Sequence, residues 1–223
     1  MSLGSGCSDS SDHEYFPLAP GFNWEYALHS KTMLFESHAK YIVDNIGPAM
    51  RGNARALAQK VQGGNIYYYR IEPDGVHRTG IRRAEGSTLK DSERDLLVLP
   101  SAPKVGASWS QATVTGVLQT EVDPFRRIYN LRATVPMTYT VESVEETVSV
   151  PAGRFTRCLK VHGTGNVHVR PDKTLGPLLV HVENTDWYAS GIGLVKTVRH
   201  ESTDSKWLAD GRYTLELVRF THD

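Results

Sequence analysis

The sequence has little that would specify a reaction, a membrane span or a polyanionic partner. No run of residues approaches the roughly 20 apolar residues that a helix needs to cross a bilayer. The 25 basic and 25 acidic side chains cancel to a formal net charge of zero. The only adjacent basic pairs are Arg82-Arg83 and Arg126-Arg127. Because nucleic-acid binding normally needs a clustered basic surface, we expect no nucleic-acid partner.

Motifs of common enzyme reactions are also absent. The sequence contains no G-x-S-x-G nucleophile elbow and no glycine-rich phosphate loop. Cys158 lies in the alternating segment FTRCLKV, where we expect a small, buried strand residue and not a reactive thiol. The sequence therefore favours a binding or structural role over catalysis, and it predicts no cofactor.

Cysteine is rare, with Cys7 and Cys158 as its two occurrences. Cys7 follows a glycine and precedes the polar run Ser8–Asp12, within a predicted flexible tether over residues 1–14. A small residue, a cysteine and a Ser/Asp-rich linker are typical of the acylation site of a bacterial lipoprotein. The alternative is an ordinary cysteine in a terminal segment. No apolar signal sequence precedes Cys7, and we interpret Met1–Leu3 as an added start on a mature sequence.

The chain does contain a series of short predicted strands. In the segment YFPLAPGFNWEYAL, one aromatic face recurs with a period of two, which predicts a strand. The segment NIYYYRIEPDGVHRTGI predicts a hairpin with its turn at Pro73-Asp74-Gly75. A shift of apolar parity near Glu142-Ser143 predicts a bulge or a tight turn. Further strands are predicted over 110–121, 128–135 and 137–150, and in the segments VPAGRFTRCLKV, NVHVR, LLVHVEN, DWYASGIGLVKTV and YTLELVRF.

Residues 33–62 admit two interpretations. The segment contains good helix formers, and 53–62 could form a short helix. Gly47-Pro48 and Gly52-Asn53 interrupt that pattern, however, and the alternation around Tyr41 also suits a sheet. We favour two or three strands, with the helix as the alternative.

Taken together, these patterns predict an all-β fold. We expect one domain over residues 15–223, built as a strongly curved, mainly antiparallel sheet that forms a half-barrel or open barrel with at most one or two short helices. The absence of long amphipathic helices leaves few parallel crossovers, so the sheet is expected to be chiefly antiparallel.

Aromatic residues on these strands are the candidate ligand-binding set. A curved sheet with aromatic residues inside can enclose an apolar small molecule or lipid. The alternative is that the same side chains simply fill the core. The candidates are Trp24, Tyr26, Tyr67, Tyr69, Trp109 and Trp187.

A weaker candidate is a metal site on the hairpin NVHVRPDKTLGPLLVHVEN. If Arg170 pairs with Leu179, His168 lies directly opposite His181 and shares a sheet face with Glu183. Two imidazoles and a carboxylate could hold zinc or copper and serve a metal-dependent enzyme. The alternative is a polar row that faces water while the valines of the hairpin face the core.

Three segments together resemble a family of bacterial secreted proteins and lipoproteins of uncharacterised function. They are YFPLAPGFNWEY, VPAGRFTRCLKV and WYASGIGLVKTV, and the likeness spans about residues 15–199. The chain departs from the family pattern at Ser190, where proline is usual, and at Ile192, where valine is usual. The resemblance implies a β-rich envelope protein, akin at fold level to lipoprotein-carrier half-barrels, a link that transfers no function.

The leading expectation is therefore a module that binds or carries an apolar molecule in a concave sheet. It would lie on the periplasmic side of a bacterial envelope and touch the membrane only through a lipid on Cys7. The alternatives are a non-enzymatic lipoprotein with a filled core that binds another envelope protein, and the metal-dependent enzyme described above.

Overall fold

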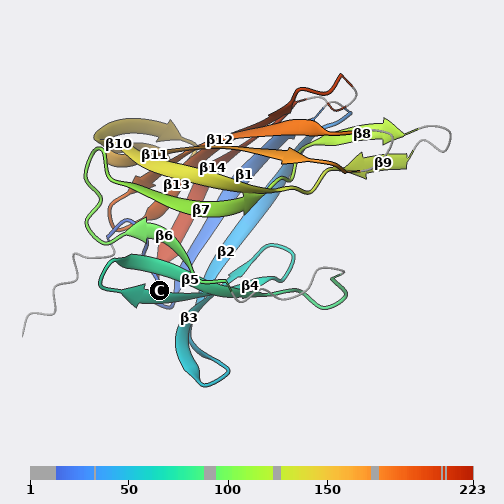
Figure 1. Ribbon diagram of the computed structural model, residues 1–223. Coiled ribbons are helices and arrows are strands. Elements are labelled where there is room, and N and C mark those ends of the chain that lie inside the picture. The colour runs from blue at the N-terminus through green and yellow to red at the C-terminus, as the bar shows by residue number, and fades with distance from the viewer. Residues whose placement is uncertain are drawn as a thin grey trace, which may run out of the picture.

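Twelve strands pair side by side in one antiparallel sheet, and two more form a separate ribbon in the computed structural model (Figure 1). The structure describes residues 14–32, 34–87, 94–122, 127–171, 176–206, 208 and 210–222. Within these ranges the strands are β1 (Phe22–Lys31), β2 (Glu36–Arg51), β3 (Ala54–Val61), β4 (Ile66–Glu72), β5 (Gly75–Arg82), β6 (Leu96–Pro100), β7 (Ser108–Val114), β8 (Gln119–Val122), β9 (Arg127–Asn130), β10 (Thr134–Val150), β11 (Gly153–Val169), β12 (Leu178–Ala189), β13 (Gly193–Thr203) and β14 (Gly211–His222).

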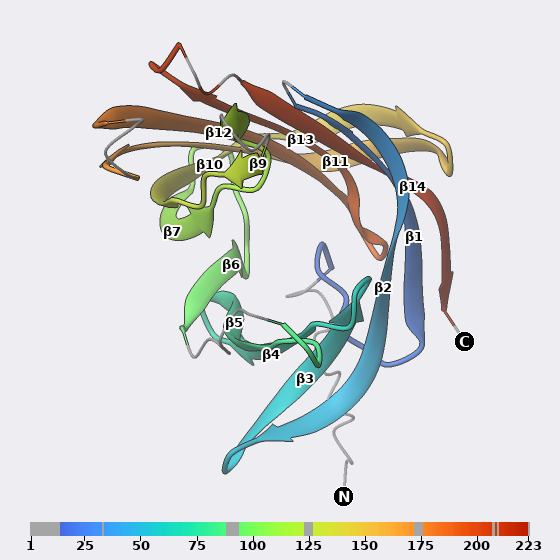
Figure 2. The same ribbon diagram turned by 90° about the vertical axis from the view of Figure 1, so that its right-hand side faces the viewer.

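The large sheet curls until its two edges approach each other. Its hydrogen-bonded order is β6-β5-β4-β3-β2-β1-β14-β13-β12-β11-β10-β7, and β8 pairs with β9. The edge strands β6 and β7 lie close together without pairing, so the sheet forms a nearly closed barrel (Figure 2). The predicted all-β, strongly curved antiparallel sheet is confirmed. No helix in the described part of the chain could cross a membrane.

The segment that admitted two interpretations forms two strands, β2 and β3, joined at Gly52-Asn53. The helix considered for 53–62 is wrong because alternate residues of β3 face opposite sides of the sheet. Gln59 and Val61 face the barrel interior, whereas Ala58 packs in a small cluster elsewhere. Gly47 marks a bulge in β2, and its φ of 92° is a conformation that favours glycine.

Two local predictions are confirmed. β4 and β5 form the expected hairpin, in which Glu72 pairs with Gly75 across the turn. β10 and β11 change register repeatedly between Val141 and Val148, where the shift of apolar parity predicted a bulge. This irregular stretch lets the tip of the β10–β11 hairpin bend back over the sheet. Ala152 in the hairpin turn donates a backbone hydrogen bond to the Leu217 carbonyl of β14 at 2.9 Å.

The single strands predicted over 110–121 and 128–135 are wrong. The first is divided into β7 and β8, because the backbone at Gly116 turns inward and donates to the Glu201 carboxylate at 3.0 and 3.1 Å. The second is divided into β9 and the start of β10. Thr115 stabilises this break, because its hydroxyl donates to the Leu131 carbonyl at 2.6 Å and accepts from the Ala133 amide at 2.8 Å.

The main aliphatic core fills the side of the barrel formed by β10, β11 and β12. Leu118 and Leu208, from connecting segments, complete it together with Leu99 of β6. Strand residues such as Leu159 and Val180 are fully buried there. Cys158 of β11 is a buried free thiol, as expected, and it belongs to a second cluster of buried residues. The tether predicted over residues 1–14, with Cys7, lies outside the described residues except for Glu14.

Candidate functional site

A cavity of about 650 Å³ occupies the other side of the barrel interior. Its walls come mainly from β1, β2, β3, β4, β13 and β14, with contributions from the segment before β1 and the turn after β7. Ligand pockets in proteins typically enclose about 300–1,000 Å³. The barrel therefore contains a filled half and a hollow half, and the hollow half is the candidate site.

Four of the six candidate aromatic residues line this cavity. They are Trp24 and Tyr26 on β1, and Tyr67 and Tyr69 on β4. Trp24 and Tyr26 are 3% and 4% exposed, whereas Tyr67 is half-buried. The sequence alternation places these rings on the inner face of their strands. Their role in ligand binding stays a prediction.

The other two aromatic candidates lie elsewhere. Trp109 on β7 pairs across the sheet with Tyr139 and stacks on its ring at 5.7 Å, but it packs against the filled core and not on the cavity wall. Trp187 on β12 pairs with Lys160 and Lys196 and packs against the buried cluster that contains Cys158, as Phe155 of the bent hairpin also does. Neither residue is part of the cavity lining.

One end of the cavity is built from two of the sequence segments that carry the family resemblance. The Trp24 indole donates to the Ile192 carbonyl at 2.7 Å, and the Tyr26 hydroxyl donates to the Leu194 carbonyl at 2.9 Å. Gly193 has a φ of 92°, and a Cβ there would lie 3.2 Å from the Pro17 ring. Glycine at this position thus permits the segment before β1 to pack against the end of the barrel.

A chain of amide side chains fixes the same segment from the opposite wall. Asn45 donates to the carbonyl oxygens of Pro17 and Ala19, both at 3.0 Å. Gln59 in turn donates to Asn45 at 3.0 Å and accepts a long bond of 3.4 Å from the Tyr69 hydroxyl. Because these groups satisfy one another, the polar atoms at this end are held in place.

A half-buried carboxyl group, Asp186 on β12, faces the cavity. Burial raises its pKa to about 6, although hydrogen bonds from Thr197 and Asn184 and the charge of Arg199 oppose that shift. The Thr197 hydroxyl and the Asn184 amide each donate to one carboxylate oxygen at 2.7 Å. The carboxylate is therefore already satisfied by its protein neighbours.

Arg199 and Glu201 form a buried ion pair beside this carboxyl group. The Arg199 Nε lies 2.7 Å from a Glu201 oxygen, and their side chains are 6% and 0% exposed. Arg199 also donates to the Thr113 hydroxyl and the Val114 carbonyl, and Glu201 accepts from the backbone of Val117. The pair holds the turn after β7 against the cavity wall.

The cavity wall also carries a second arginine and several tyrosine hydroxyls. Arg78 on β5 pairs with Tyr69, and its guanidinium carbon lies 5.6 Å from the centre of the Tyr67 ring. Tyr139 and Tyr213 also face the cavity. Burial raises the pKa of Tyr213 to about 12, so this hydroxyl remains protonated at neutral pH.

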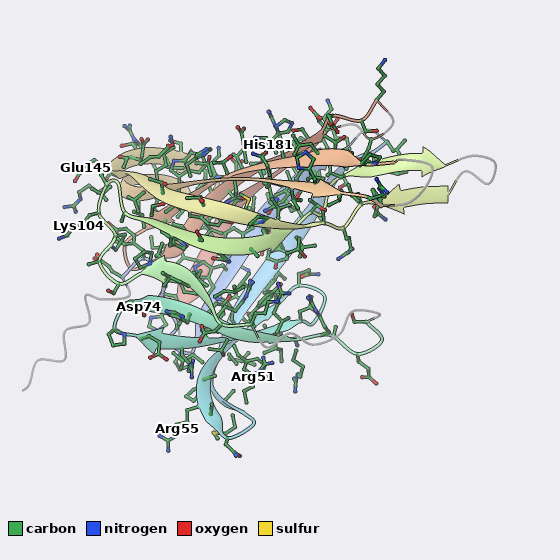
Figure 3. The ribbon with its side chains drawn as sticks, in the orientation of Figure 1. Arg51, Arg55, Asp74, Lys104, Glu145 and His181 are labelled. Atoms are coloured by element: carbon green, nitrogen blue, oxygen red, sulfur yellow. The ribbon has the colours of Figure 1, made fainter. Side chains whose placement is uncertain are left out.

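The register predicted for the His168–His181 hairpin is wrong by two residues. His168 pairs with Leu179, and His181 pairs with Asn166, whose side-chain oxygen lies 2.5 Å from the His181 ring. His181 also contacts Glu183 at 3.3 Å, and it projects from β12 on the outside of the barrel (Figure 3). The hairpin valines Val180 and Val182 do face the core, as predicted. A register error of two residues leaves each side chain on the same face of the sheet but gives it a different cross-strand partner. His168 and His181 therefore share a face without lying opposite each other.

In the described part of the chain, a different set of residues brings possible metal-ligating atoms within 4.8 Å of one another. These are His29 on β1 and Glu36 and His38 on β2. His29 pairs with His38, and their rings stack at 4.3 Å with an interplanar angle of 7°. Sequence reasoning did not single them out, because the pairing of β1 with β2 was not predicted.

The polar residues of the cavity were also not anticipated. Thr197, Arg199 and Glu201 alternate along β13 and are all buried. In the segment LVKTVRH, a regular strand would place the apolar residues Leu194 and Val198 on the opposite face from Thr197 and Arg199. The alternation alone therefore predicts that the apolar face, and not the polar one, points inward. A bulge at the Trp187/Tyr188 step of the β12–β13 pair changes the register there.

Comparisons with known proteins return a fold likeness alone. No family model and no curated protein matches the chain. One similar solved structure is a candidate lipoprotein from Parabacteroides distasonis, with 14% identity, a TM-score of 0.44, and coverage of 94% of this chain and 99% of that one. Another is a candidate exported protein with a YmcC-like fold from Bacteroides fragilis, with 13% identity, a TM-score of 0.42 and the same coverage. Likeness at this level carries no functional assignment.

Proposed function

We propose that this protein is a binding module that takes a small molecule with a largely apolar body into the barrel cavity. The observation that supports this most directly is the cavity itself, which measures about 650 Å³ and is walled by Trp24, Tyr26, Val43 and Val61. These four side chains are buried, so a ligand body placed against them would leave water. Removal of apolar surface from water is the main driving force for such binding.

Proteins use aromatic residues to fill cores as well as to build pockets, so the placement of the rings matters. Here the polar atoms of Trp24 and Tyr26 are hydrogen-bonded to the backbone of the 192–194 segment. This anchoring holds the rings at one end of the interior instead of letting them collapse across it. It favours a preformed pocket, which lowers the ordering cost of binding.

The probe N-phenyl-1-naphthylamine, a neutral aryl amine that fluoresces in apolar surroundings, tests the proposal by titration. We expect saturable binding to the wild-type chain. Val43→Phe places a ring in the cavity and should raise the Kd at least about 10-fold, or roughly 1.4 kcal/mol. Val218→Phe is the matched control, because Val218 is exposed on β14 and does not line the cavity. If the probe does not bind, or if both variants bind it like the wild type, the cavity is not a binding site and a partner-binding role becomes the better interpretation.

We also propose that the protein acts in a bacterial envelope, anchored through a lipid on Cys7. The sequence around Cys7 and the resemblance to secreted proteins and lipoproteins support this. In cells that make the protein with its natural upstream residues, labelled palmitate should be incorporated into the wild-type chain and not into Cys7→Ala. Equal labelling of both chains, or of neither, would contradict the anchor.

A further inference from the structure

Arg78 is a cation on the cavity wall whose charge no carboxylate balances within the described residues. Its side chain is half-buried and lies over the Tyr67 ring at 5.6 Å. A contact with a ring face engages the plane of a guanidinium and leaves its N–H edge available. That edge matches the geometry of a carboxylate, sulfonate or phosphate group.

The two other charged side chains of the cavity lining already have protein partners. Arg199 is paired with Glu201 at 2.7 Å, and each oxygen of Asp186 accepts a side-chain hydrogen bond. The charge of Arg78 is therefore the one that a ligand would have to balance. Leaving a half-buried cation without a counter-charge costs free energy, which a bound anion would recover.

Two tyrosines of the cavity lining also offer hydroxyl groups toward the same interior. Tyr139 lines the cavity, and the positive charge of Arg78 is among the influences on its pKa, which burial raises strongly. Its hydroxyl therefore stays protonated and can donate. Tyr69, whose backbone pairs with that of Arg78 across the strands, also lines the cavity, and its hydroxyl donates a long bond of 3.4 Å to Gln59. A cation and hydroxyl donors together form a suitable site for an anionic oxygen group.

We infer that the cavity ligand is an anionic amphiphile, whose charged oxygen group binds Arg78 and whose apolar body contacts the Trp24 and Tyr26 walls. This inference rests on the proposed binding function and specifies the class of ligand. A fatty acid, an aryl sulfonate or a lipid phosphate shares this chemistry. A neutral molecule of the same shape would fill the apolar part of the cavity and leave Arg78 unbalanced.

A matched pair of probes separates the charge from the apolar body. 8-Anilinonaphthalene-1-sulfonate has the ring system of N-phenyl-1-naphthylamine and adds a sulfonate. At about 0.15 M salt, which limits general surface attraction, the wild-type chain should bind the sulfonate about 10-fold more tightly than the neutral probe. Arg78→Gln should weaken sulfonate binding about 10-fold and change neutral-probe binding by less than about 2-fold. Arg78→Lys, which keeps the charge and loses the planar fork, should retain part of the preference.

The control is Arg51→Gln. Arg51, labelled in Figure 3, also lies over a tyrosine ring, that of Tyr68 at 5.2 Å. Neither residue lines the cavity. The control variant should leave the binding of both probes unchanged, and near-UV circular dichroism should verify that every variant is folded. If the neutral probe binds but the sulfonate shows no preference, or if Arg78→Gln weakens both probes equally, the inference is wrong and the proposed function stands. If neither probe binds the wild-type chain, both fail.

Discussion

The two halves of the barrel interior obey the same strand alternation and reach opposite results. Between β10, β11 and β12, inward-facing residues such as Val135, Val161 and Val180 meet in a dense aliphatic core. Between β1, β4 and β14, the inward-facing residues are mostly larger aromatic side chains, yet a cavity of about 650 Å³ remains. Side-chain size therefore does not decide which half is filled.

The aromatic rings around the interior are held in place by two different kinds of contact. Where the two halves meet, the Tyr139 ring lies beside Gly163, where an added Cβ would come within 2.5 Å of a ring carbon. The glycine thus makes room for dense packing. In the hollow half, Trp24 and Tyr26 are fixed by hydrogen bonds to backbone carbonyls at the end of the barrel. The Trp24 and Tyr26 rings are thus held in place by hydrogen bonds, whereas the Tyr139 ring is held by close packing against a glycine.

The largest expected effect is on the free energy of unfolding, when one leucine from each half is replaced by alanine. Leu159→Ala should lower the free energy of unfolding by about 3–4 kcal/mol, because Leu159 is fully buried in the packed half and its loss creates a new cavity. Leu215→Ala should cost only about 1–2 kcal/mol, since Leu215 already borders empty space. Urea denaturation of the two variants and the wild type measures both values.

The same pair of variants can break the comparison. Equal losses of stability would mean that the region around Leu215 is packed as tightly as the region around Leu159, and the distinction between the halves would fail. A change in the slope of the denaturation curve would indicate an altered unfolded state, in which case the two values could not be compared directly.

The sequence predicts the strands well because alternation, turn residues and breaks are local signals. The β4–β5 hairpin and the bulge near Glu142 both follow from such signals. The division of 110–121 into two strands does not, since it depends on Gly116 donating to Glu201, which lies 85 residues away. The His168–His181 register likewise depends on the geometry of the connecting turn, which the composition of the strands does not fix.

The candidate site is predictable only in part for a related reason. The alternation in the sequence shows that Trp24 and Tyr26 lie on the same face of their strand. It does not show whether their rings pack against side chains on the opposite side of the barrel or border an empty space. Arg78 gave no signal, because an arginine in a hairpin strand is ordinarily expected to face water. The residues that distinguish a pocket from a core became visible only when strands distant in sequence were placed opposite one another.

The smallest expected effect concerns Asp186, the half-buried carboxyl group of the hollow half. Burial raises its pKa to about 6, above the ordinary value of 3.8, so the folded chain binds a proton more tightly than the unfolded chain. The contribution of protonated Asp186 to the stability of the folded chain is therefore complete below about pH 4 and is lost as the pH rises through 6. Asp186→Asn removes this loss. The free energy of unfolding of the variant should exceed that of the wild type by about 1–2 kcal/mol at pH 7.5 and by much less at pH 4.

Exposed Glu85→Gln is the control for this pH dependence, and it should show a difference from wild type that varies little with pH. Denaturation at several pH values between 4 and 7.5 gives the comparison. The neighbours that also carry charge or titrate are Arg199, Tyr139, Tyr188 and Tyr213, and burial keeps the three tyrosines protonated over this range. A stability difference that does not grow with pH would mean that Asp186 is better solvated than its surroundings imply. The hollow half would then be wetter than its aromatic walls suggest, and an apolar ligand would gain less by entering it.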